Sequence, residues 1–228
     1  MDEVVVLTGA GMSADSGLKT FRDSDGLWEG YDVRDVATVQ AWQDNKEKVL
    51  DFYNKRRKQA FEADPNAGHK ALAKLEESYE VTIITQNVDS LHERAGSENV
   101  VHLHGELSKV RSEKDRSLIY NIGGRPIEVG DAAEDGSQLR PHVVWFGEPV
   151  PKMEEAYSII SEADILIVIG TSLVVYPAAG LVDLADSDIP KYIIDPNNPE
   201  LADYTGWKHI KKTAAVGTPE LVDELLSL

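Results

Sequence analysis

Four short runs of β-branched and other apolar residues constrain the fold of this chain most strongly. They are Val4–Leu7, Val81–Ile84, Ile165–Ile169 and Tyr192–Ile194, which are continuous runs of β-branched and apolar residues and do not alternate with polar ones. A strand that is apolar on both faces belongs in a parallel sheet that is covered by helices on both sides. The sequence therefore predicts an α/β fold with such a sheet at its centre.

Helical patterns lie between these runs. A proline at the first helical position lacks only an N–H that would be unpaired there anyway, so Pro219 is predicted to start the last helix. The predicted helices cover Ala41–Ala63, Asn66–Ser78, Met153–Ala163, Ala178–Ala185 and Pro219–Leu226.

The segment from 112 to 139 interrupts this pattern. It contains Gly123, Gly124, Gly130 and Gly136 among many charged residues, which predicts an inserted β-hairpin or loop module. We expect one domain over 1–228. Its larger lobe should come from 1–24, 79–111 and 140–228, and its smaller lobe from 25–78 and 112–139.

Composition excludes several classes of protein. The chain has 228 residues, a formal net charge of -17 and no cysteine. The charge disfavours general binding to nucleic acid or to an anionic membrane. The lack of cysteine excludes disulfides and a cysteine-bound zinc. The acidic start of the chain has no signal-peptide pattern, and its longest strongly apolar run, Ile165–Ile169, cannot span a bilayer. We expect a soluble cytoplasmic protein, and the oligomeric state is left open.

A glycine-rich turn follows the first apolar run. In Gly9–Ala10–Gly11, small residues would let the backbone approach a pyrophosphate, and free N–H groups would bind it. The alternative is a tight turn without a ligand. A dehydrogenase would add an acidic residue about 20 positions further on, at the end of a second strand. Asp32 and Asp35 lie near that distance, but no apolar strand precedes them. Hydride transfer is therefore disfavoured.

Polar residues end two further runs. Gln86, Asn87 and Asp89 follow Val81–Ile84, and such side chains are costly to bury without hydrogen bonds. They suit an amide and ribose hydroxyls, although Asn87 or Asp89 could instead cap the next helix. The third run leads into Gly170–Thr171–Ser172, which could hold ribose or phosphate or form a simple turn.

Two histidines lie in the extended run from 100 to 107. In a regular strand His102 and His104 would face the same side. A metal pair, a hydrogen-bonded structural histidine and a general base all remain open, although no third ligand follows at matched spacing.

Tyr53 and Arg56 are three residues apart on a predicted helix and so share a face. A phenol and a guanidinium can together hold a carboxylate. The alternative is that Tyr53 and Arg56 simply lie on a solvent-exposed helix face within the basic run Lys55–Lys58, and spacing alone favours this alternative. Farther along, the apolar run Val143–Phe146 could pair with an extended peptide or form an internal strand.

Taken in order, these pieces resemble the sirtuin family. The resemblance rests on GAGMSADSGLKTFR, TQNVDSLHERAG, HLHGEL, HVVWFGE and IGTSLVVYPAAG, and it covers nearly the whole chain except 112–139. It implies a Rossmann-like lobe with a smaller inserted lobe. It also implies an NAD-dependent protein-lysine deacylase, which consumes NAD and yields nicotinamide, O-acyl-ADP-ribose and the lysine amine.

The resemblance also assigns roles to residues. His104 matches the general base, with Asn87 beside it at the catalytic centre. Asn87 and Asp89 would line the nicotinamide pocket, and Gln86 would lie by the ribose. The other expected dinucleotide contacts are Gly9, Ala10, Gly11, Ser13, Asp15, Phe21, Arg22, Gly170, Thr171, Ser172, Asn197 and Ala214.

The segment DFYNKRR resembles the subgroup that removes acidic acyl groups, in which Tyr53 and Arg56 would hold the distal carboxylate of succinyl- or malonyl-lysine. Ala37 would leave room for the acyl chain. The expected contacts to the substrate peptide are Val144, Phe146 and Gly147.

One departure from the family is large. Most sirtuins bind a structural zinc through four cysteines, and Ser112 stands where the first is expected. We therefore expect a zinc-free lobe and no metal. Mono-ADP-ribosyl transfer, NAD hydrolysis and a non-catalytic NAD-binding module remain as alternatives.

Overall fold

The computed structural model describes residues 1–19, 27–28, 30–201 and 203–227. Its larger lobe contains a six-stranded parallel sheet in the order β11-β10-β9-β1-β4-β5. All four apolar runs are central strands of this sheet, so the predicted fold class is confirmed. The strands are β1 (Glu3–Thr8), β4 (Glu80–Thr85), β5 (Val100–His102), β9 (Ile165–Ile169), β10 (Lys191–Ile194) and β11 (Trp207–Ile210).

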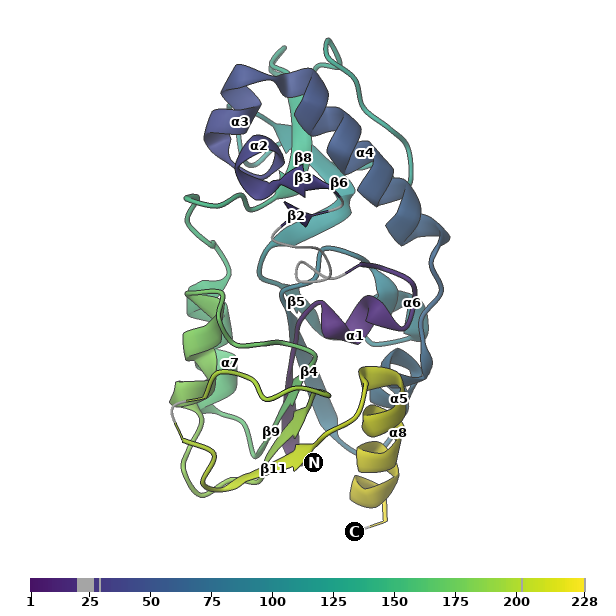
Figure 1. Cartoon of the computed structure of the whole chain (residues 1–228), viewed down its shortest axis with the longest axis vertical. Coiled ribbons are helices and arrows are strands. Elements are labelled where there is room, and N and C mark those ends of the chain that lie inside the picture. The colour runs from purple at the N-terminus through teal and green to yellow at the C-terminus, as the bar shows by residue number, and fades with distance from the viewer. Residues whose placement is uncertain (20–26, 29, 202, 228) are drawn as a thin grey trace.

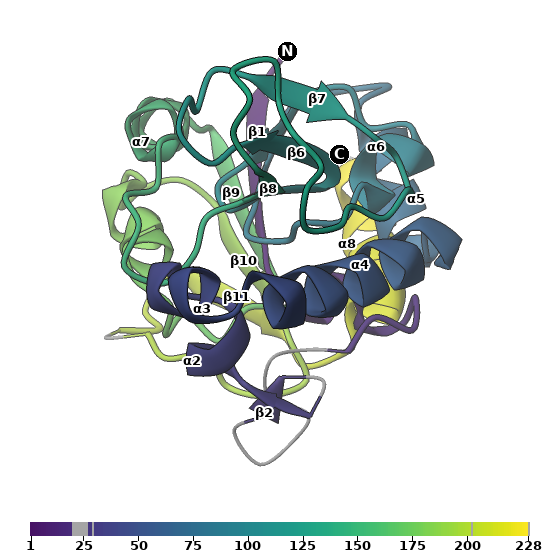
Figure 2. The ribbon, with the colours of Figure 1, turned by 90° about the horizontal axis from the view of Figure 1, so that it is seen from above.

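Helices cover both faces of the sheet, which explains the continuously apolar strands. On β1, Val4 and Val6 belong to one core cluster and Val5 and Leu7 to the other, and all four are fully buried. Figure 2 shows α7 on one side of the sheet and α5 and α8 on the other. The covering elements are α5 (Ala67–Leu75) and α8 (Ala214–Leu225) on the first face, and α7 (Met153–Ser161) and the 3₁₀ helix at Ala178–Leu184 on the second.

The smaller lobe lies above this sheet in Figure 1. An antiparallel sheet in the order β7-β6-β8 packs against three helices, and a short pair, β2 (Leu27–Trp28) and β3 (Tyr31–Asp32), lies beside them. The elements are β6 (Gly105–Ser112), β7 (Ile119–Asn121), β8 (Leu139–Val143), α2 (Val33–Val36), α3 (Val39–Asp44) and α4 (Lys46–Glu62). Two short helices, α1 (Gly11–Ala14) and α6 (Leu91–Ala95), follow β1 and β4.

The lobe boundaries remain a prediction. Leu107, Val110 and Val143, from segments assigned to the larger lobe, pack in the core of the smaller one. Strands β6 and β8 pair with each other on either side of the insert, so they share its core.

Two predicted helices differ from the structure. The segment 41–63 is not one helix, because Asn45 has an extended φ of -155° and its side chain caps α4 by accepting from the Lys48 amide. Pro219 lies inside α8 and not in its first turn, since α8 begins at Ala214 after the N-cap Thr213.

The run containing His102 and His104 is not a regular strand. β5 ends at His102, and β6 begins at Gly105. Gly105 has a φ of +83°, and a Cβ there would lie 2.1 Å from the carbonyl oxygen of His142. Only glycine fits this turn, which redirects the chain between the two lobes.

A polar cluster occupies the point where the family's zinc site is expected. The buried hydroxyl of Ser112 donates to Asp135 over 2.7 Å, lies 2.6 Å from the Ser137 hydroxyl, and accepts from the amides of Lys114 and Asp115. These bonds tie the end of β6 to the turn before β8.

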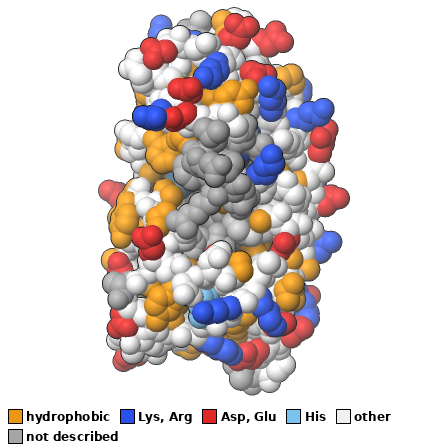
Figure 3. Space-filling model, viewed as in Figure 1, with side chains coloured by type: hydrophobic (Ala, Val, Ile, Leu, Met, Phe, Trp, Pro, Cys, Tyr) orange, Lys and Arg blue, Asp and Glu red, His pale blue; other side chains and the backbone are white. Residues whose placement is uncertain are grey.

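The outer surface of the described chain is mixed. Acidic and basic side chains are interspersed over the face in Figure 3, and hydrophobic ones gather at its middle height. None of the helices in the described residues has the length and apolarity needed to cross a membrane.

Candidate active site

A cavity of about 730 Å³ opens at the carboxyl ends of β1, β4 and β9, where open parallel sheets bind ligands. It brings together every predicted site residue that the structure describes. Phe21 and Arg22 lie outside the described residues. The predicted residues that line it are Gly9, Ala10, Gly11, Ser13, Asp15, Ala37, Tyr53, Arg56, Gln86, Asn87, Asp89, His104, Val144, Phe146, Gly147, Gly170, Thr171, Ser172, Asn197 and Ala214.

The glycine-rich turn joins the ends of β1 and β9. The Gly9 amide donates to the Ile169 carbonyl over 3.0 Å, and the Gly11 amide donates to the Gly170 carbonyl over 2.8 Å. A Cβ on Gly11 would lie 2.7 Å from the Gly170 Cα. The amides of Gly9 and Gly11 are therefore engaged within the protein, and phosphate binding by the turn stays a prediction. These glycines instead allow two strand ends to touch under the cavity floor.

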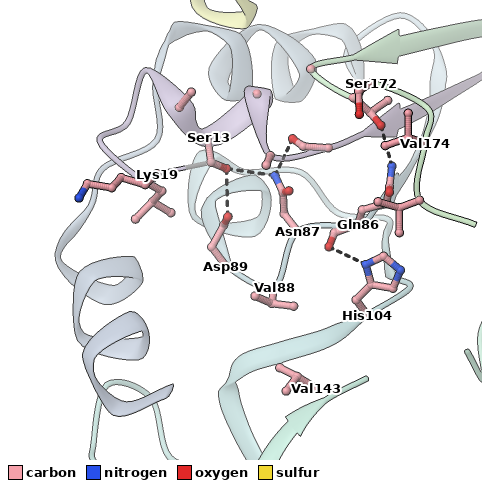
Figure 4. A pocket seen from close by; sticks show the side chains of 18 of the residues that line it. Ser13, Lys19, Gln86, Asn87, Val88, Asp89, His104, Val143, Ser172 and Val174 are labelled. Carbon is pink, nitrogen blue, oxygen red and sulfur yellow. Dashed lines mark hydrogen bonds between the residues drawn. The ribbon is translucent and has the colours of Figure 1, made fainter. Parts of the chain in front are cut away.

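A hydrogen-bonded group formed by Ser13, Asn87 and Asp89 lies against this turn (Figure 4). Asn87 Nδ2 donates to the Gly9 carbonyl over 3.0 Å and to Ser13 Oγ over 3.2 Å. Ser13 Oγ donates in turn to Asp89 over 3.0 Å. Burial raises the pKa of Asp89, against the bonds it accepts from the Leu91 amide and Ser13. Asp89 also accepts a hydrogen bond from the Leu91 amide at the start of α6, as the capping alternative expects, and its contact with a ligand stays a prediction.

Gln86 connects the ends of β4 and β9. Its Nε2 donates to Thr171 Oγ1 over 3.1 Å, and its carbonyl oxygen lies 3.0 Å from His104 Nδ1. A carbonyl only accepts hydrogen bonds, so Nδ1 of His104 carries a proton. The lone pair of the neutral ring is then on Nε2. Burial lowers the pKa of His104, so the ring is neutral near neutral pH and can accept a proton.

His102 binds the next carbonyl of the same loop. Its Nδ1 donates to the Asn87 carbonyl over 3.1 Å, and its Nε2 lies 2.6 Å from the Glu93 carboxylate. Burial lowers its pKa, but the hydrogen bond and charge of Glu93 and the charge of Glu106 outweigh burial and raise it. The two histidines thus hold consecutive loop carbonyls, which removes the paired-metal interpretation. Glu93, His102 and Glu106 have ligand atoms within 4.8 Å of one another, but both His102 nitrogens are engaged; the expected absence of a metal stays a prediction.

The far end of the cavity contains Tyr53, Arg56 and Ala37. Tyr53 is only 3% exposed, so the solvated-face interpretation is wrong for this residue. Its hydroxyl accepts a hydrogen bond from Trp145 Nε1 over 3.1 Å, and burial raises its pKa to about 12. The Arg56 guanidinium lies 5.7 Å from the Phe52 ring centroid.

The segment after β8 bridges the two lobes. The Val144 amide donates to the His104 carbonyl over 2.9 Å, and the Phe146 amide donates to the Ala37 carbonyl over 3.0 Å. These bonds place Val144, Phe146 and Gly147 along the cavity between His104 and α4. Phe146 remains 50% exposed.

The sequence analysis missed several lining residues. Trp145 holds Tyr53, and Asp195 and Thr213 lie near Asn197 and Ala214 at the other end. Asp195 directly follows β10, so the strand-end rule could have found it. Trp145 lies in the run Val143–Phe146, but only tertiary packing shows that its indole binds Tyr53, and Thr213 had no local signal.

The fold and the cavity define a dinucleotide-binding enzyme with a neutral histidine at the junction of two lobes. More specifically, the chain belongs to the Sir2 family, whose model matches residues 9–177. The resemblance to sirtuins is thereby confirmed.

Curated relatives and solved structures agree with this assignment. The chain is 53% identical over 228 residues to a Helicobacter pylori protein named NAD-dependent protein deacylase, covering 100% of this chain and 99% of that one. It is 49% identical to a protein of the same name from Bacteroides thetaiotaomicron, with 99% of each covered. A Sir2 homologue–NAD complex is 39% identical with a TM-score of 0.90, covering 99% of this chain and 90% of that one. An ADP-ribose complex of a Sir2 homologue variant is 40% identical with a TM-score of 0.91, covering 99% and 94%.

Proposed function

We propose that this protein removes acyl groups from protein lysines at the expense of NAD, and accepts succinyl and malonyl groups as well as or better than acetyl. The NAD-dependent deacylase class is that of its family and its relatives. The observation that carries the acyl preference is that one cavity is lined by His104 and, from the smaller lobe, by Tyr53, Arg56 and Ala37. We also propose that it acts in the cytoplasm on acylated proteins or peptides.

The residues of the cavity fit NAD. Small residues and paired glycines shape the floor, and Asn87 and Asp89 are buried polar groups at the end of β4. Bound NAD supplies the ribose–nicotinamide bond, which breaks as the acyl oxygen of the substrate attacks the ribose. Asn87 and Asp89 would hold the nicotinamide, with Gln86 beside the ribose.

His104 would then take a proton from a ribose hydroxyl. Its Nδ1 is committed to the Gln86 carbonyl, so Nε2 is the accepting atom. A general base in this position contributes about 10²–10⁴-fold to rate. The deprotonated hydroxyl would then take over the acyl group, and with one water consumed the products would be nicotinamide, O-acyl-ADP-ribose and the lysine amine.

The acyl preference follows from charge. A succinyl or malonyl group ends in a carboxylate, which an acetyl group lacks. Arg56 can bind that carboxylate through a bidentate pair of hydrogen bonds. The Tyr53 oxygen accepts from Trp145, which leaves the Tyr53 hydroxyl proton to donate to the same carboxylate. Losing one such charge-assisted bond in a buried site costs about 1.5–3 kcal/mol, or roughly tenfold to a hundredfold.

A panel of acyl peptides with NAD, read by mass spectrometry, tests the proposal. One peptide carrying acetyl-, succinyl- or malonyl-lysine is compared on the wild type and on Arg56→Met, with Lys55→Met as the matched control. Lys55 is on the same helix with its side chain 61% exposed. Selective loss of the acidic acyl groups in Arg56→Met is expected. Equal turnover of all three acyl groups, unchanged by Arg56→Met, would exclude the preference.

Two alternatives have separate tests. Nicotinamide release from NAD without any acyl peptide would favour NAD hydrolysis or mono-ADP-ribosyl transfer. Full turnover of every acyl peptide by His104→Tyr would contradict the assigned base, and no turnover by the wild type would favour a non-catalytic NAD-binding module.

A further inference from the structure

A second pocket, of about 490 Å³, lies between α3, β6 and the segment after β8. Gly147 and Glu148 line both this pocket and the main cavity. The pocket is therefore next to the segment that we propose contacts the substrate peptide. Five cationic side chains line it: Lys46, Arg111, Lys114, Arg116 and Arg140.

Two of these cations are matched by carboxylates. Arg140 binds both oxygens of Glu148 through its two terminal nitrogens, at 2.9 and 3.0 Å. Lys46 lies 2.6 Å from Glu113. Glu113 and Glu148 are the two acidic residues among the described residues that line the pocket.

The other three cations, Arg111, Lys114 and Arg116, have no carboxylate of their own among the described residues that line the pocket. Arg111 and Arg116 each make one long contact with Glu148, at 3.4 and 3.5 Å, although Arg140 already holds that carboxylate. Within the described residues, the Lys114 ammonium forms no hydrogen bond or ion pair. This surplus of positive charge lies in a chain whose formal net charge is -17.

Arg111 gives the pocket a fixed, partly dehydrated cation. Its side chain is only 7% exposed. Burial, followed by the charge of Arg140, lowers its pKa to about 10, so it stays charged at neutral pH without a full counter-charge. A buried cation of this kind is costly unless an anion reaches it. Lys114 and the 54% exposed Arg116 flank it and can close on a ligand from solvent.

We propose that this pocket binds the carboxylate of an aspartate or glutamate that flanks the acyl-lysine in the substrate. The inference rests on the proposed deacylase function and deepens it. Gly147 and Glu148 continue the segment proposed to pair with an extended peptide, and such a peptide advances about 3.3 Å per residue. An acidic side chain a few positions from the acyl-lysine can therefore reach the second pocket while the acyl group enters the first. Positive potential focused by the pocket walls would favour that carboxylate over neutral side chains.

A peptide scan tests the pocket. One acyl-lysine peptide carries a single glutamate at each of the three positions on either side of the lysine, and the matched peptide carries glutamine there. The wild type should show a KM about threefold to tenfold lower for glutamate at one or two positions, with kcat unchanged. Lys114→Gln combined with Arg116→Gln should remove that preference. Lys70→Gln, an exposed lysine on α5 in the larger lobe, is the control and should retain it.

Other outcomes would overturn the inference. If glutamate and glutamine peptides have equal KM values at every position in the wild type, the pocket does not bind an acidic side chain of the substrate. If the preference persists at full size in the double variant, Lys114 and Arg116 do not contribute to it, and the inference fails. If free citrate or phosphate shifts the Tm of the wild type but not of the double variant, while the peptides do not differ, the pocket binds small anions instead.

The test separates this inference from the proposed function. Peptide binding is also measured by fluorescence anisotropy with a labelled acyl peptide, which needs no turnover. Absent turnover with retained glutamate selectivity in binding would reject the deacylase activity alone. Turnover of the glutamine peptides without glutamate selectivity would reject the pocket alone. Both Lys114 and Arg116 have exposed side chains, so the double variant should fold, and its Tm checks this.

Discussion

Trp145 donates a hydrogen bond from its indole Nε1 to the hydroxyl oxygen of Tyr53 over 3.1 Å. Both rings are buried, and the Arg140 guanidinium lies 3.3 Å from the centroid of the Trp145 ring. The indole N–H donates to the phenol oxygen, so the Tyr53 hydroxyl can use its own proton as a donor to another group. Two residues 92 positions apart thus prepare one donor at the far end of the cavity.

Tyr53→Phe should lower kcat/KM for desuccinylation by about tenfold, because a buried donor to the acyl carboxylate is lost. Deacetylation should change by less than about threefold, since an acetyl group offers no carboxylate. Steady-state kinetics on matched peptides measures both. An equal fall for the two acyl groups would show that Tyr53 only maintains packing.

The pH profile of deacylation should report His104. Burial lowers its pKa from the ordinary 6.5, so the base is deprotonated above that lowered value. We expect kcat/KM to be full at neutral pH and to fall only as the pH drops through that lowered pKa. His104→Asn should lower turnover by at least about 10²-fold while NAD still binds, as calorimetry can check. Loss of NAD binding in this variant would point to a structural role instead.

His102 should act as a positioning residue for the loop that carries Asn87. Its raised pKa means that the charged ring is favoured in the folded protein. This contribution is fully present below the ordinary pKa of 6.5 and is lost as the pH rises through the raised value. In the wild type the KM for NAD should therefore increase as the pH rises through the raised pKa of His102. We expect His102→Asn and Glu93→Gln to raise the KM for NAD several-fold and to make it less dependent on pH.

A purely structural His102 would give a different result. The Tm of His102→Asn would fall, but its KM for NAD at low and high pH would keep the wild-type ratio. Exposed Glu98, close to the same helix, supplies Glu98→Gln as the control, which should change neither quantity.

Ser112→Ala should destabilise the smaller lobe by about 1–3 kcal/mol, because Ser112 is fully buried and its hydroxyl joins four partners. The bonds from Ser112 and Ser137 hold the pKa of Asp135 at about 2, and NMR titration of that carboxyl should show the pKa rising in the variant. Ser158→Ala on the exposed face of α7 is the control for Tm. Purified protein should contain no stoichiometric zinc, and EDTA should leave its Tm unchanged; one zinc per chain would contradict this.

Gly11→Ala should lower stability by about 1–3 kcal/mol, because its Cβ would lie 2.7 Å from the Gly170 Cα and the two strand ends would separate. Gly180→Ala is the control, since its nearest heavy atom would be 3.6 Å away. Chemical denaturation measures both. An unchanged midpoint for Gly11→Ala would show that the turn relaxes freely.

Local patterns predicted much of the fold. The continuously apolar runs identified the central strands, because burial on both faces leaves no room for polar alternation. The sequence pattern did not predict the edge strand at Trp207–Ile210, because its lysine and histidine interrupt the apolar residues. The break at Asn45 was missed because its residues suit a helix, and only the backbone angle and the cap divide it.

The sequence by itself determined the chemistry available to this protein. It supplied an imidazole at His104, a polar loop at Gln86–Asp89, and a phenol and guanidinium on one helical face. Only the tertiary structure decided how these groups act. The Gln86 carbonyl accepts a hydrogen bond from Nδ1 of His104 and so determines which ring nitrogen carries the proton. The Trp145 indole donates to the Tyr53 hydroxyl, and the Gly11 amide donates to the Gly170 carbonyl. Each of these contacts joins residues far apart in the chain, and local sequence patterns carry no information about such distances.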